Sequence, residues 1–113
     1  MATNNQFVQA TIESIIDFYD PEKIILFGAF YQGNLNKRSI VNLLLIKDTD
    51  LPKSQRPAAI NEHLGETEFP LDILIYTTEE YYQGMSNPKS FLYNMTKQSR
   101  IMYEKQELVG RKV

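Results

Sequence analysis

Residues 40–47 read IVNLLLIK, an apolar run that only Asn42 interrupts before its final lysine. Successive side chains of a β-strand point to opposite faces, so a strand that is apolar at almost every position is buried on both faces. The run is also far too short to cross a membrane, which takes about 20 apolar residues in a helix. We therefore predict that residues 40–47 form the central strand of a sheet.

The flanking segments predict the remaining elements. Apolar side chains recur at helical spacing over residues 5–19, and Asp20-Pro21 ends this helix because proline disfavours helical geometry in the residue before it. The other expected elements are strands at 23–28 and 69–77, an edge strand at 100–104, and helices from Pro57 to Leu64, from Thr78, and from Asn87-Pro88 to about Gln98. This order indicates an α/β (α+β) fold, a small mixed sheet with helices packed on one face.

The composition bounds the size of the fold and its partners. With 113 residues, 42% of them hydrophobic, we expect a single domain over residues 1–104 and a flexible tail at 105–113. The formal net charge is −2, so no global positive field attracts nucleic acid. Cysteine is absent, which excludes disulfides and thiolate chemistry. The segment MATNNQFVQ lacks the pattern of a signal peptide, so we expect a cytoplasmic protein without a membrane partner.

Two stretches carry a resemblance to a known family. Residues 23–56, KIILFGAFYQGNLNKRSIVNLLLIKDTDLPKSQR, together with FPLDILIYTTEEY at 69–81, resemble the minimal nucleotidyltransferases of the DNA polymerase beta superfamily. The resemblance extends over about residues 5–104 and implies the polymerase-beta-like nucleotidyltransferase fold. In that family the first strand ends in Gly-Ser, the second begins with Asp-x-Asp, and the third carries one more acid. The three carboxylates hold two divalent metal ions, and the Gly-Ser turn holds a nucleotide triphosphate.

The family's pattern of acids has a physical reason. Side chains two residues apart on a strand share a face, so Asp-x-Asp directs two carboxylates toward one point. A third acid on a neighbouring strand completes an all-oxygen site for magnesium. The paired metal ions neutralise the phosphates and stabilise both the attacking and the leaving oxygen.

This chain departs from that pattern at the acids. Ile40 and Asn42 occupy the positions of the Asp-x-Asp pair, and Asp72 matches the third acid. The exchange removes like-charge repulsion and is expected to bury Ile40. Asp48 and Asp50 cannot substitute, because six strand residues separate Asn42 from Asp48 by roughly 20 Å. We therefore expect Asp72 to be the remnant of the catalytic acids and no metal to bind, with Asp72 and Asn42 as the only oxygen ligands left for residual binding.

The resemblance also implies a nucleotide-binding set. Gly28 matches the turn glycine, while Ala29 takes the place of the serine and lacks its hydroxyl. Ser39 matches the serine before the acids, and Lys53 and Arg56 match a basic pair that often follows the second strand. These five residues are the candidate nucleotide-binding residues.

The lost acids favour an inactive nucleotidyltransferase-like domain that acts as a binding or regulatory, antitoxin-like subunit without a cofactor. The resemblance implies a protein partner, either a helical HEPN-type protein or a further copy of the chain. Two alternatives stay open. One is an active enzyme that uses Mg²⁺ and ATP to move AMP onto a protein or small molecule, and the other is a metal-free nucleotide sensor.

Two weaker patterns favour structural explanations. The spacing of Arg56 and His63 matches that of helical HEPN ribonucleases, but the predicted strands make a coincidence the better interpretation. Aromatic residues are frequent in the second half of the chain, where a core or a subunit contact is favoured over a nucleotide-stacking surface; they are Tyr76, Tyr81, Tyr82, Phe91, Tyr93 and Tyr103.

Overall fold

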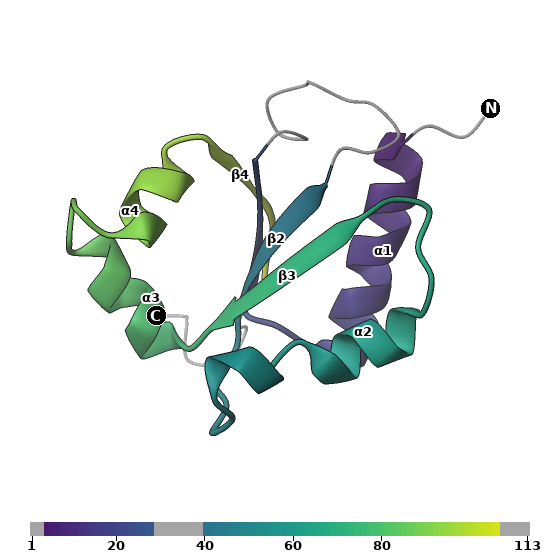
Figure 1. Ribbon diagram of the computed structural model, residues 1–113, viewed down its shortest axis with the longest axis horizontal. Coiled ribbons are helices and arrows are strands. Elements are labelled where there is room, and N and C mark those ends of the chain that lie inside the picture. Colours follow the sequence, from purple (N-terminus) through teal and green to yellow (C-terminus); the bar gives the residue numbers. More distant parts are fainter. Residues whose placement is uncertain (1–3, 29–39, 107–113) are drawn as a thin grey trace.

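The computed structural model describes residues 4–28 and 40–106, which form one four-stranded sheet with helices around it (Figure 1). The helices are α1 (Asn4–Tyr19), α2 (Ala58–Leu64), α3 (Thr78–Met85) and α4 (Phe91–Thr96), with a 3-10 turn at Lys53–Gln55. The strands are β1 (Lys23–Phe27), β2 (Val41–Ile46), β3 (Leu71–Tyr76) and β4 (Ser99–Glu104). The mixed α/β class expected from the sequence is confirmed.

The strands lie in the order β3-β2-β1-β4. Strand β2 pairs antiparallel with β1 and parallel with β3, and β1 pairs antiparallel with β4. Val41, Leu43 and Leu44 are fully buried in β2. The prediction of a central strand at 40–47 is therefore confirmed, and β4 is the edge strand expected at 100–104.

Helices cover both faces of the sheet, and the prediction of helices on one face only is wrong. Leu43 and Leu45 of β2 belong to the hydrophobic core under α1 and α2. Leu44 and Ile46, which alternate with them, pack with Leu92 of α4 in a second core. Figure 1 shows α1 and α2 on one side of the sheet and α3 and α4 on the other. The reason is the apolar run itself, because a strand that is apolar on both faces needs apolar cover on both.

One helix cap and one helix start differ from the sequence prediction, while α3 begins at Thr78 as expected. Helix α3 is capped by Thr77 rather than Thr78, since the Thr77 hydroxyl accepts a hydrogen bond from Glu80 N–H and the Glu80 carboxylate accepts one from Thr77 N–H. Helix α4 begins at Phe91 rather than at Asn87-Pro88. There the Ser90 hydroxyl accepts from Tyr93 N–H at 3.0 Å and caps the helix, whereas the Asn87 side chain accepts from Lys89 N–H in the turn before it.

The chain remains bound to the sheet just after β4. Lys105 N–H donates to the Glu22 carbonyl oxygen at 2.9 Å, and its ammonium group lies 3.0 Å from the Asp20 carboxylate. Most of the tail expected at 105–113 lies outside the described residues.

Within the described residues, no helix has the length and apolar character needed to cross a membrane.

Candidate functional site

The fold brings Asn42 and Asp72 together. They are direct partners in the parallel register of β2 and β3, so their side chains lie on the same face of the sheet. That face is the one covered by α3 and α4, because Leu44 and Ile46, two and four residues beyond Asn42, pack into the core on that side. The two polar positions that the sequence assigned to one site are therefore neighbours at one end of the sheet.

Asn42 also lies against Gly28. Gly28 directly follows β1 and has φ +88°, a backbone conformation that L side chains rarely adopt. A Cβ atom at this position would come within 2.5 Å of the Asn42 side-chain nitrogen Nδ2. The amide of Asn42 thus occupies the space directly beside the turn at Gly28.

Ile40 is not buried, contrary to the sequence prediction. It lies one residue before β2, and 49% of its surface is exposed, whereas Val41 is fully buried. The strand begins at Val41, so Val41 rather than Ile40 takes the first buried position. Ala29 and Ser39, the other predicted neighbours of this site, lie outside the described residues.

Arg56 and Lys53 lie at the opposite end of β3 from Asp72. The Arg56 guanidinium is buried, and its Nη1 donates to the Ile75 carbonyl oxygen at 3.0 Å, near the carboxyl end of that strand. The Lys53 ammonium lies 4.3 Å from the centre of the Tyr76 ring. The structure therefore does not bring this basic pair together with Gly28, Asn42 and Asp72.

Arg56 is instead the centre of a closed polar cluster. Its Nη1 and Nη2 donate to the two carboxylate oxygens of Glu80 at 2.7 and 3.2 Å, and its Nε donates to the Leu51 carbonyl oxygen at 2.7 Å. A paired guanidinium and carboxylate of this kind join the 3-10 turn, β3 and α3. Glu80 was not among the predicted site residues, although the Thr77-x-x-Glu80 spacing of a capping box pointed to its role at the start of α3.

Acid should weaken this cluster through Glu80. The hydrogen bonds from Arg56 lower the pKa of Glu80 from 4.5 to about 2, against an opposing effect of burial and with further help from Thr77 N–H. Because the folded state favours the ionised carboxylate, its contribution to the free energy of unfolding is complete above about pH 4.5 and is lost as the pH falls toward 2. As the pH falls through this range, the free energy of unfolding measured with denaturant should therefore decrease more steeply for the natural chain than for Glu80→Gln. Equal pH dependence in the two proteins would contradict the ion pair.

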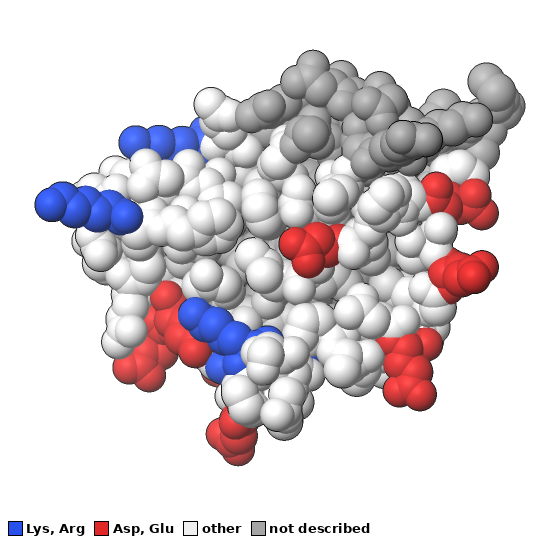
Figure 2. Space-filling model, in the orientation of Figure 1, with Lys and Arg blue, Asp and Glu red and all other residues white. Residues whose placement is uncertain are grey.

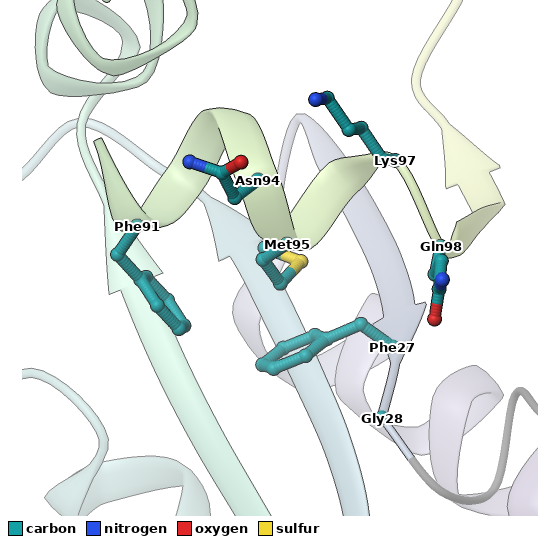
Figure 3. A pocket seen from close by; sticks show the side chains of 7 residues that line it. All are labelled: Phe27, Gly28, Phe91, Asn94, Met95, Lys97 and Gln98. Carbon is teal, nitrogen blue, oxygen red and sulfur yellow. The ribbon is translucent and has the colours of Figure 1, made fainter. Parts of the chain in front are cut away.

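A hollow of about 310 Å³ lies beside Gly28, between the end of β1 and α4. Its lining is Phe27, Gly28, Phe91, Asn94, Met95, Lys97 and Gln98 (Figure 3). The Phe27 and Phe91 rings meet edge to face, with centroids 6.3 Å apart. Figure 3 shows Met95 next to the Phe27 ring and the Lys97 side chain directed away from it. The hollow can accept an aromatic or apolar group, and only the frequency of aromatic residues in this half of the chain hinted at it.

The residues at this end of the sheet do not fit the two-metal arrangement that the resemblance implies. Asp72 offers one carboxylate and Asn42 one neutral oxygen, while two metal ions need several hard oxygen ligands held in common. In the described part of the chain, no group of three or more histidine, aspartate or glutamate side chains lies close enough together to hold a metal ion. No reaction step through paired metal ions can be derived from this geometry.

No family model matches the chain, and no curated protein sequence matches it.

Proposed function

We propose that this chain is a nucleotidyltransferase-like domain with a polymerase-beta-like fold and a lost metal site, and that it acts as a binding or regulatory, antitoxin-like subunit. The observation that carries the proposal is the position of Asn42. Its neutral amide lies beside Asp72 in the register of β2 and β3 and packs against the Gly28 turn. At the point where the family's catalytic acids would converge, this chain has a packing contact.

A neutral amide suits a domain that functions without metal. Two carboxylates held close together repel each other and raise each other's pKa, which destabilises the empty site. With Ile40 and Asn42 at these positions, Asp72 has no such acidic neighbour. Restraint of a partner would then come from binding alone. The proposed partner is a helical HEPN-type protein or a further copy of the chain, and the proposed compartment is the cytoplasm.

Restoring the acids should restore metal binding. The triple change Ala29→Ser, Ile40→Asp and Asn42→Asp would place two carboxylates next to Asp72, which with substrate phosphates are the ligands magnesium uses in such sites. Titration calorimetry with Mg²⁺ and Mn²⁺ should then detect affinity in the triple variant that the natural chain lacks. Adding Asp72→Asn to the triple variant is the matched control and should abolish the gain. Equal affinity in the natural chain and the triple variant would show that the site has been assigned to the wrong residues.

The hollow beside Gly28 favours a second candidate, a metal-free nucleotide sensor. Its two phenylalanine rings could hold a nucleobase next to the turn. ATP in the presence of a chelator should then raise the melting temperature by mass action, and Phe91→Ala should remove the gain. Tyr82→Ala, which removes an exposed ring outside this hollow, should keep it. If saturating ATP left the melting temperature unchanged, the sensor hypothesis would be rejected.

The active enzyme is the remaining alternative and depends on Asp72. It requires consumption of labelled ATP with Mg²⁺ or Mn²⁺ and loss of that activity in Asp72→Ala. Activity that survives Asp72→Ala would come from another source.

A further inference from the structure

The charged side chains are distributed unequally over the two helical layers. No lysine or arginine occurs in α1 (Asn4–Tyr19) or in residues 58–68, which comprise α2 and the turn after it. The acidic residues of these segments are all exposed: Glu13, Asp17, Glu62, Glu66 and Glu68. We call these five residues the acidic face. Figure 2 shows acidic side chains over α1 and α2, on the right of the view.

In the opposite layer the acidic residues are confined to the first turn of α3, at Glu79 and Glu80. Residues 81–103 contain no aspartate or glutamate, and the exposed residues Lys89 and Lys97 flank the ends of α4. Between them in sequence lies Phe91, which is 58% exposed. We call Lys89, Phe91 and Lys97 the basic face. Figure 2 shows lysine and arginine side chains over α4, on the left of the view, at the other end of the molecule from the acidic ones.

Within the described residues, neither face is neutralised by its own chain. The ion pairs there are Lys23–Glu104, Arg56–Glu80 and Lys105–Asp20, and they use no residue of either face. Among the described residues, Lys97 also lies 5.2 Å from the centre of the Tyr93 ring and Glu13 accepts a hydrogen bond from Gln9, but neither contact neutralises a charge that a binding partner could meet. The net charge of −2 disfavours association of copies only weakly, so local charge complementarity can outweigh it.

The acidic face also has a hollow that could receive an aromatic side chain. It is an open depression of about 540 Å³ between α1 and α2, lined by Ala10, Glu13, Ser14, Asp17, Phe18 and His63. The rings of Phe18 and His63 are stacked with centroids 4.0 Å apart, and Phe18 is 46% exposed. Phe18 thus offers an exposed aromatic surface in the same hollow as the carboxylates of Glu13 and Asp17, and Phe91 lies between Lys89 and Lys97 in sequence.

We propose that the basic face of one copy binds the acidic face of a second copy, with Phe91 in the hollow between α1 and α2. Lys89 and Lys97 would then approach Glu13 and Asp17 of the neighbouring copy. The two faces are different and lie on opposite sides of the sheet, so the contact is head to tail, and each bound copy leaves one face open for another. The inference does not depend on the proposed function, since it uses none of Gly28, Asn42 and Asp72.

Sedimentation velocity of the natural chain tests the contact directly. At low ionic strength the average mass should rise above the monomer mass of 13.1 kDa as the protein concentration increases. In about 1 M salt the mass should return to that of the monomer, because the screening length falls to about 3 Å. A monomer at every concentration in low salt would overturn the proposal, and would leave an acidic foreign protein as the occupant to be sought for the basic face.

Charge reversal distinguishes a head-to-tail contact from any other association. Lys89→Glu with Lys97→Glu reverses the basic face, and Glu13→Lys with Asp17→Lys reverses the acidic face. Each double variant alone should stay monomeric at low salt, while an equimolar mixture of the two should associate again, since the reversed faces complement each other. Lys53→Glu makes half of that charge change outside both faces and should associate like the natural chain. A mixture that stays monomeric would overturn the pairing of these two faces.

The aromatic contact has its own control. Phe91→Ala should weaken association at least about tenfold, as expected for a central aromatic residue of an interface. Tyr82→Ala removes another exposed ring, 65% exposed on α3 and in neither face, and should leave association unchanged. If Phe91→Ala and Tyr82→Ala affected association equally, Phe91 would not be part of the contact between copies.

Discussion

Replacing Arg56 with methionine should lower the free energy of unfolding by about 3 kcal/mol. Methionine keeps the apolar volume of the side chain but leaves Glu80 without its cation, and it removes the donors to the Leu51 and Ile75 carbonyl oxygens. The figure lies at the lower end of the range for breaking a buried ion pair, because the Glu80 side chain keeps 31% of its surface in water. Denaturant unfolding at neutral pH measures the loss.

The control variants separate geometry from charge. Arg56→Lys keeps the charge but cannot donate in parallel to both carboxylate oxygens, so it should recover only part of the stability. Lys53→Met removes a neighbouring charge whose ammonium group lies over the Tyr76 ring, and it should cost about 0.5–1 kcal/mol. A loss for Arg56→Met no greater than that for Lys53→Met would mean that the Arg56–Glu80 pair does not stabilise the fold.

The role of Arg56 could not be predicted from the sequence because two of its partners, Ile75 and Glu80, are distant along the chain. Leu51, Ile75 and Glu80 meet only after β3 and α3 have packed beside the 3-10 turn. A lysine and an arginine after a strand therefore resembled a phosphate site. Sequence patterns give the residue type, but whether a guanidinium faces water or a carboxylate is decided by tertiary contacts.

The strands were predictable because their apolar runs depend on local sequence alone. Residues 40–47 were correctly assigned to the central strand, and the same run also implied cover on both faces, which the prediction of one helical layer overlooked. That Asn42 and Asp72 lie next to each other was also predicted, since their adjacency follows from the parallel register of two strands. The contact between Asn42 and Gly28 was not predicted, because it depends on the conformation of the Asn42 side chain.

Replacing Gly28 with alanine should destabilise the fold through two separate effects. The positive φ of +88° costs about 1–3 kcal/mol for a residue with a Cβ atom. Crowding against the Asn42 amide, which the new methyl group would approach to 2.5 Å, adds about 1 kcal/mol, at the lower end of the range for overpacking, because Nδ2 is the end of a side chain that can turn away. Gly65→Ala is the control without crowding, since Gly65 also has a positive φ of +64° but its new methyl group would meet no atom within 4 Å. The free energy of unfolding measured with denaturant should therefore fall further for Gly28→Ala than for Gly65→Ala.

A double-mutant cycle assigns the difference to Asn42. In the Asn42→Ala background, Gly28→Ala should cost only as much as Gly65→Ala, because the atom that crowds the methyl group has gone. A coupling free energy of about 1 kcal/mol or more between the two positions is the expected result. Additive effects would mean that the Asn42 amide does not lie over the turn in solution, and the main support for a lost metal site would fail with it. Strong coupling would mean that the Asn42 side chain points at the Gly28 turn. Because aspartate has the same shape as asparagine, the carboxylate introduced by Asn42→Asp would then point at the turn as well.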